Sequence, residues 1–114
     1  MNTLTIPEAG PVLTTERQII DLIGQTFGQQ IDLVIIPTTR LGPDFFSLRT
    51  GLAGTVAQKF ANYRLRLAIL GDITAHLTAS EAFRDFVRET NRGTQLWFVS
   101  DQRELERKLS ARPC

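Results

Sequence analysis

Asp72 and His76 are the residues whose types and spacing are best suited to chemistry. They stand four residues apart, directly after an apolar segment. A carboxylate and an imidazole could form an acid–base pair or bind a metal ion. The alternative, which we favour, is that Asp72 caps a turn and His76 is a solvated loop residue, because two such residues in one loop rarely form a site.

Other polar residues follow apolar segments in the same way, among them Arg40 and Ser100. Sites in α/β proteins usually lie at the carboxyl ends of parallel strands. An enzyme or a small-molecule sensor would therefore have its site at this edge of the sheet. The residues available to it are Asp72, His76 and either Arg40 or Asp44. With one histidine and no serine elbow, the sequence contains no Ser–His–Asp arrangement, and it predicts no cofactor and no metal ion.

Phe45 and Phe46 are adjacent aromatic residues on a polar connection. Two neighbouring rings do not easily face one core, so one of them could be exposed for a partner. The equally weighted alternative is that both rings are buried beneath the following helix.

Gly51 and Gly54 lie three residues apart near the start of that helix. They do not form a phosphate-binding loop, because the Gly-Lys-Ser/Thr ending and the Gly-x-Gly-x-x-Gly form are both missing. We interpret them, and Gly24 in the preceding helix, as small residues that allow close packing.

Local signals divide the first half of the chain into a hairpin and a helix. Residues 3–6 and 11–14 predict two short strands that pair as a hairpin. Thr15 and Gln18 have the spacing of a capping box, which opens a predicted helix over residues 16–27.

Strands and helices alternate in the rest of the chain. Apolar runs predict strands at residues 31–36, 63–70 and 95–99. Between them, an apolar stripe with a period of four residues predicts a helix that includes Leu52, Val56 and Phe60. Residues 73–77 read as a loop, and Thr78 with Glu81 reads as a capping box for another helix.

The resulting order, β-β-α-β-α-β-α-β-α, predicts an α/β fold with a mostly parallel central sheet. We expect a single domain over residues 1–114, with an N-terminal β-hairpin and about four helices.

Composition limits the classes of partner. Thirteen basic and twelve acidic side chains give a net charge of +1, which disfavours nucleic acid and anionic membranes as partners. The one cysteine, Cys114, excludes a disulfide within this sequence. No basic segment followed by an apolar one stands at the N-terminus, so we expect a cytoplasmic protein.

A longer run of residues resembles a known bacterial family. The matching residues are Phe45, Phe46, Leu48, Thr50, Gly51, Ala53, Gly54, Gln58, Lys59, Phe60, Asn62, Tyr63, Gly71, Asp72, Arg84, Asp85, Phe86, Glu89, Asn91 and Gly93. They are similar to the pattern of the family catalogued as domain of unknown function 4180. That family has no established activity, so the resemblance implies a fold and no reaction.

The chain also resembles, more distantly, the STAS domains of sulphate transporters and anti-sigma-factor antagonists. Thr50-Gly51-Leu52 is similar to the helix-start turn at which STAS domains bind a kinase-type partner and are phosphorylated. The resemblance implies Thr50 as a possible phosphoacceptor, with Ser47 as a second candidate. Leu48 and Arg49 depart from the acidic residue and the first serine of the STAS turn.

Two hypotheses about function follow. The preferred one is a small non-catalytic regulatory or protein-interaction module, which is STAS-like and binds a protein partner or a second copy of itself. Its interaction surface would be the Arg40 to Gly51 loop and the helix start, with candidate binding residues Arg40, Asp44, Phe45, Phe46, Thr50, Gly51 and Asp72. The alternative is a small-molecule-binding protein or an enzyme with a site around Asp72 and His76.

Overall fold

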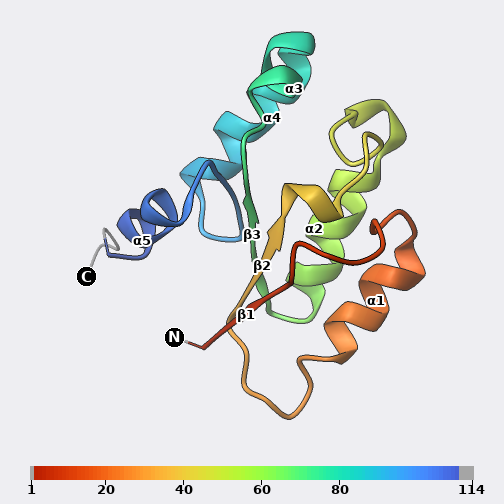
Figure 1. Ribbon diagram of the computed structural model, residues 1–114, viewed down its shortest axis with the longest axis vertical. Coiled ribbons are helices and arrows are strands. Elements are labelled where there is room, and N and C mark those ends of the chain that lie inside the picture. The colour runs from red at the N-terminus through yellow and green to blue at the C-terminus, as the bar shows by residue number, and fades with distance from the viewer. Residues whose placement is uncertain (1, 111–114) are drawn as a thin grey trace.

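The computed structural model describes residues 2–110, and Cys114 lies outside the described residues. Its centre is a parallel sheet of four strands in the order β1-β2-β3-β4 (Figure 1). The strands are β1 (Thr3–Thr5), β2 (Leu33–Pro37), β3 (Arg66–Leu70) and β4 (Leu96–Val99). Every adjacent pair is parallel, which confirms the predicted α/β class.

The described part of the chain also contains five α-helices and two 3₁₀ turns. The α-helices are α1 (Glu16–Gly24), α2 (Leu52–Asn62), α3 (Thr74–Ala79), α4 (Glu81–Arg92) and α5 (Gln102–Ser110). The 3₁₀ turns are η1 (Thr38–Arg40) and η2 (Leu48–Thr50). In Figure 1, α1 and α2 lie on one side of the strands and α5 lies on the other. Each new strand is added beside the previous one at the same edge of the sheet. Right-handed crossovers therefore place α1, α2 and α4 on the same face.

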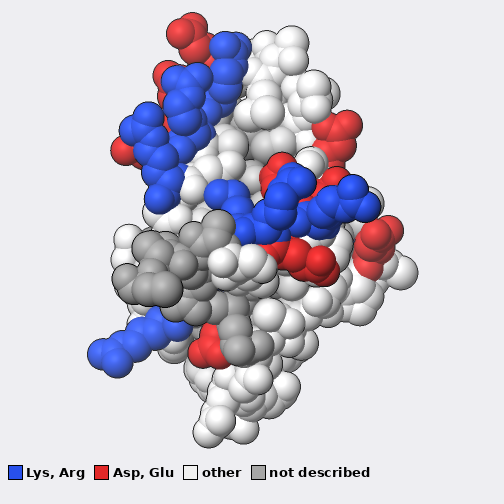
Figure 2. Space-filling view, turned by 90° about the vertical axis from the view of Figure 1, so that its left-hand side faces the viewer, with Lys and Arg blue, Asp and Glu red and all other residues white. Residues whose placement is uncertain are grey.

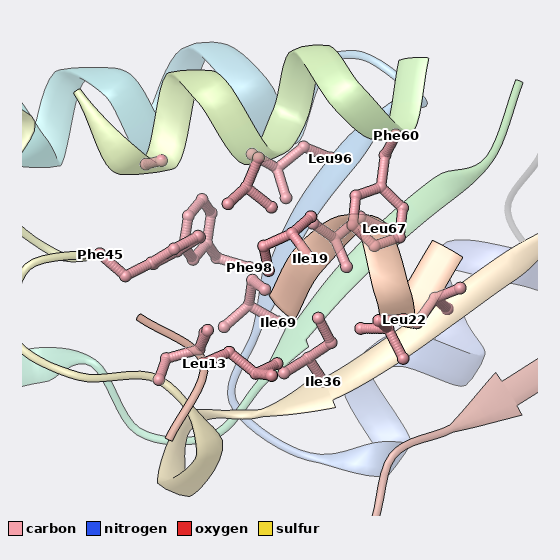
Figure 3. Packing of buried hydrophobic residues seen from close by; sticks show 14 of the residues in the cluster. Leu13, Ile19, Leu22, Ile36, Phe45, Phe60, Leu67, Ile69, Leu96 and Phe98 are labelled. Carbon is pink, nitrogen blue, oxygen red and sulfur yellow. The ribbon is translucent and has the colours of Figure 1, made fainter. Parts of the chain in front are cut away.

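Two clusters of buried side chains hold these layers together. The larger one lies between the sheet and α1, α2 and α4, and it includes Phe83 of α4. Figure 3 shows Ile19 and Phe60 of the same cluster. The smaller one lies on the opposite face, where Leu105 of α5 packs with Trp97 of β4. β2 is buried along its whole length because it contributes side chains to both clusters.

The predicted N-terminal hairpin is wrong. Residues 3–5 form β1, but β1 pairs in parallel with β2, with Thr3 opposite Leu33. Residues 11–14 form no strand, and their one sheet-like contact is a bridge from Leu13 to Leu41. The long apolar β2 is a better pairing partner for β1 than the short segment at residues 11–14. The loop between β1 and that segment does not form a hairpin turn, because Arg40 binds its carbonyl oxygens.

The helix boundaries confirm one predicted cap and correct another. Thr15 and Gln18 form the complete capping box at the start of α1, although α1 ends at Gly24 and not at residue 27. The predicted loop at residues 73–77 is wrong, because α3 occupies most of it. The cap of α4 is Ser80, whose hydroxyl accepts the Phe83 N–H at 3.1 Å.

The glycine interpretation is also wrong. A Cβ atom added to Gly24, Gly51 or Gly54 would meet no atom within 4 Å, so these residues do not mark close packing. Gly51 has φ 75° and supplies the left-handed residue between η2 and α2. Close packing occurs instead at Gly71, which has φ +147° and lies against the Thr38 side chain.

Among the described residues, no helix is long and apolar enough to cross a membrane.

Candidate functional site

A cavity of about 440 Å³ lies between the loop before α2 and the α3–α4 junction, and we call it the loop–α3 groove. Its lining residues are Pro43, Phe46, Ser47, Leu48, Arg49, His76, Ala79, Ser80 and Ala82. The loop side belongs to the segment predicted as an interaction surface, and the opposite side contains His76. The groove therefore joins two parts of the chain that the sequence analysis treated separately.

Thr50 fixes the loop side of the groove. Its hydroxyl lies 2.6 Å from the Asp44 carbonyl oxygen and 2.9 Å from that of Ser47, and it accepts the Leu52 N–H at 3.2 Å. This exposed hydroxyl thus links the loop, η2 and the first turn of α2. A phosphoryl group on Thr50 would remove the hydrogen that the two carbonyls accept, so phosphorylation would have to open this turn.

Phe45 and Phe46 are both buried, with exposed fractions of 0% and 6%. The structure therefore confirms the alternative in which both rings are buried. Phe45 points into the core toward Phe98, with ring centroids 6.3 Å apart (Figure 3). Phe46 lies at the floor of the groove, where its ring stacks on the His76 imidazole at 4.1 Å and 8°. Both rings therefore anchor the loop to the rest of the fold.

The polar side chains that line the groove are those of Arg49, His76, Ser47 and Ser80, and each can donate a hydrogen bond. Arg49 supplies a guanidinium, His76 an imidazole, and Ser47 a hydroxyl, whereas no carboxylate is among the lining residues. Asp44 is exposed beside the loop and does not line the groove. The lining therefore suits a ligand group that accepts hydrogen bonds or has a negative charge.

Asp72 and His76 are not brought together. The Asp72 carboxylate accepts hydrogen bonds from the Thr74 N–H at 2.9 Å and the Thr74 hydroxyl at 2.5 Å. The hydroxyl first, and the amide second, lower the pKa of Asp72 below its ordinary value. Asp72 lines a different cavity, of about 240 Å³, together with Ser100 and Glu104. In residues 2–110, no group of three or more His, Cys, Asp or Glu side chains is arranged to hold a metal ion.

Arg40 is bound within the fold. Its guanidinium donates hydrogen bonds to the carbonyl oxygens of Pro11 at 2.7 Å, Pro7 at 2.9 Å and Ala9 at 3.3 Å. The loop closes around it, because a Cβ atom on Gly10 would lie 2.8 Å from the Arg40 Cζ. Arg40 lines a third cavity, which shares no lining residue with the groove.

Figure 2 shows Lys and Arg side chains in separate groups on this side of the molecule, with Asp and Glu side chains among them. In α4, Arg88 and Asp85 form an i,i+3 ion pair at 3.7 Å. At this distance and exposure, the pair contributes little to stability.

Sequence analysis missed the contribution of Arg49 and of the α3–α4 junction to the groove. The type of residue at position 49 was visible, but its proximity to His76 depends on how α3 folds back over the loop. A helix prediction for residues 74–79 would have been the only local signal.

Comparison with known proteins gives the family and nothing about the ligand. The family described as Domain of unknown function (DUF4180) matches residues 1–109. No curated protein and no solved structure matches the chain, so the STAS-like resemblance is not confirmed. Since the match covers nearly the whole sequence, the chain belongs to the DUF4180 family.

Proposed function

We propose that the protein is a non-catalytic binding module that takes an acidic segment of a partner protein into the loop–α3 groove. The observation that carries this proposal is the lining of the groove, which contains Arg49 and His76 and no carboxylate. A carboxylate of the partner would accept hydrogen bonds from these groups while its apolar atoms contact Leu48 and Ala79.

The rigidity of the loop supports binding at this place. Loops that carry binding residues are effective when a fixed scaffold positions them. Here the scaffold consists of the buried rings of Phe45 and Phe46 and the three contacts of the Thr50 hydroxyl. Little conformational entropy would be lost when a partner binds, because the loop is already ordered by these contacts.

The separation of Asp72 from His76 supports a binding role over a catalytic one. General acid–base catalysis needs the two groups within reach of one substrate. Asp72 is instead engaged by Thr74 and lines a different cavity from His76.

The test is an affinity capture from native lysate with four forms of the protein. Wild type and Ala61→Glu should retain the same partner, because Ala61 is an exposed residue of α2 that does not line the groove. Ala79→Glu places a carboxylate in the groove and should abolish capture. Arg49→Ala should reduce it at least about fivefold, by the loss of one charge-assisted hydrogen bond.

Overlapping synthetic peptides that cover the sequence of the captured protein are then prepared. Their affinities for wild type are measured by fluorescence anisotropy. Acidic peptides should bind wild type more tightly than versions with Gln for Glu. A partner captured equally by Ala79→Glu, or no partner captured by wild type, would contradict the proposal.

A further inference from the structure

A second cavity, of about 280 Å³, lies between α1 and the loop that follows β1, and we call it the α1 cavity. Apolar side chains form most of its wall, and they are Ile6, Pro7, Pro11, Leu13 and Leu22. The remaining lining residues are polar, and they are Arg40 and three residues of the α1 segment, Gln18, Asp21 and Gln25. Its volume is slightly below the roughly 300–1,000 Å³ of sites for drug-sized molecules, so it suits a smaller ligand.

Arg40 provides a fixed cation at this cavity. The three backbone carbonyl oxygens that it contacts are bound to Nε and Nη1. Its other terminal nitrogen, Nη2, makes no hydrogen bond within residues 2–110 and can donate to a ligand. A guanidinium held in this way loses little freedom when it binds a carboxylate.

Asp21 provides an anion on the opposite wall. It lies on α1 with Gln18 and Leu22, and Gln25 is the residue that caps this helix. Their i, i+3, i+4, i+7 spacing places all four residues on one face toward the cavity. The exposed Asp21 carboxylate forms no ion pair with Arg40, although both line the cavity, and the two ion pairs in the described part of the chain involve other residues. A gap therefore separates the two opposite charges.

We propose that the α1 cavity binds a small aliphatic zwitterion, with an α-amino acid as the ligand class. Its carboxylate accepts hydrogen bonds from Arg40 Nη2, and its ammonium group donates to the Asp21 carboxylate. Its hydrocarbon side chain lies against Leu13 and Leu22. A ligand with both charges can contact both residues, whereas a simple carboxylate can contact only Arg40 and a simple amine only Asp21.

The test is a set of NMR titrations of the amide signals with three probes of the same hydrocarbon skeleton. The probes are L-leucine, 4-methylpentanoate, which lacks the ammonium group, and 3-methylbutylamine, which lacks the carboxylate. L-leucine should give saturable shifts at Leu13, Leu22 and Gln25. Each of the other two probes should bind about two- to fivefold more weakly, because each loses one contact with a solvent-accessible charge.

Two variants localise the binding. Asp21→Asn changes an exposed side chain without a partner in the described residues, so the protein should fold normally and bind L-leucine about two- to fivefold more weakly. Glu89→Gln makes the same chemical change on an exposed position of α4 and should leave the affinity unchanged. The proposal is overturned if L-leucine gives no saturable shifts, if 4-methylpentanoate binds equally well, or if Asp21→Asn binds like wild type. None of these outcomes bears on the loop–α3 groove, which shares no lining residue with the α1 cavity.

Discussion

At the scale of single residues, side chains predicted to bind a partner are used inside the molecule. Arg40 holds a loop, Thr50 holds a turn, and Phe45 is part of the core. The local fold depends on each of these three side chains, and this explains why their types stand out from the neighbouring sequence. A conspicuous residue in a single sequence is thus as much a signal of structure as of function.

Asp72 gives a prediction about pH. Its pKa is lowered in the folded state by the Thr74 hydroxyl and amide, so its contribution to stability is complete above the ordinary aspartate pKa of 3.8 and is lost as the pH falls through the lower, folded value. Thr74→Val removes the hydroxyl and keeps the amide. We expect the Asp72 pKa of this variant, measured by NMR of the carboxyl carbon, to rise toward 3.8.

Thr78→Val is the matched control for this titration. Its hydroxyl donates to the Thr74 carbonyl oxygen at 3.0 Å and does not touch Asp72. The Asp72 pKa should stay as in wild type. An unchanged pKa in Thr74→Val would show that the hydroxyl is not the main cause of the shift.

At the scale of the elements, Asn91 of α4 closes the outer edge of β4. Its side-chain oxygen accepts the Phe98 N–H at 2.8 Å, and its side-chain nitrogen donates to the Phe98 carbonyl at 3.2 Å. The amide occupies the position that another strand would take. An edge without such cover is a place where chains associate.

Asn91→Ala should therefore have two effects. The part-buried N–H and C=O of Phe98 lose their partners, and the free energy of unfolding should fall by about 1–3 kcal/mol in chemical denaturation. Light scattering should also show more self-association.

The control is Asn62→Ala, which removes the contact of an exposed side chain with Gln58 and should change stability by less than about 0.5 kcal/mol. Equal stabilities of Asn91→Ala and wild type would show that water replaces the amide without loss.

At the scale of the whole molecule, strand order explains why the predicted site residues do not meet. In many α/β proteins the strand order reverses, and a crevice opens at the strand ends. The described sheet runs β1-β2-β3-β4 without a reversal. Residues after different strands, such as Arg40 and Asp72, consequently line separate cavities.

The class of fold could be predicted from the sequence, and the pairing of its first strand could not. Buried strands such as β2 and β3 have apolar residues on both faces, and the capping box of α1 is a local signal that needs no tertiary contact. Pairing of β1 with β2 is a contact between distant residues, so local turn signals pointed to a hairpin instead. The short α3 was missed because its six residues contain no buried one.

The groove and the α1 cavity could not be predicted for the same reason. Each combines residues from segments separated by a strand or a helix, and their types are ordinary for exposed positions. His76 illustrates this, since its ring stacks on Phe46, a neighbour thirty positions earlier in the sequence that only the completed fold supplies.

The unreversed strand order also has a kinetic consequence. Each strand pairs with the next strand along the chain, so no strand pairing has to skip an intervening strand. The conformational entropy lost in closing the connection is therefore similar for each pair. The two five-residue strands, β2 and β3, form the most extensive pairing and can start the sheet. In pulsed hydrogen exchange during refolding, we expect amides of β2 and β3 to become protected before those of the three-residue β1. Earlier protection of β1 would mean that the sheet grows from the amino-terminal strand, as it could while the chain is being synthesised.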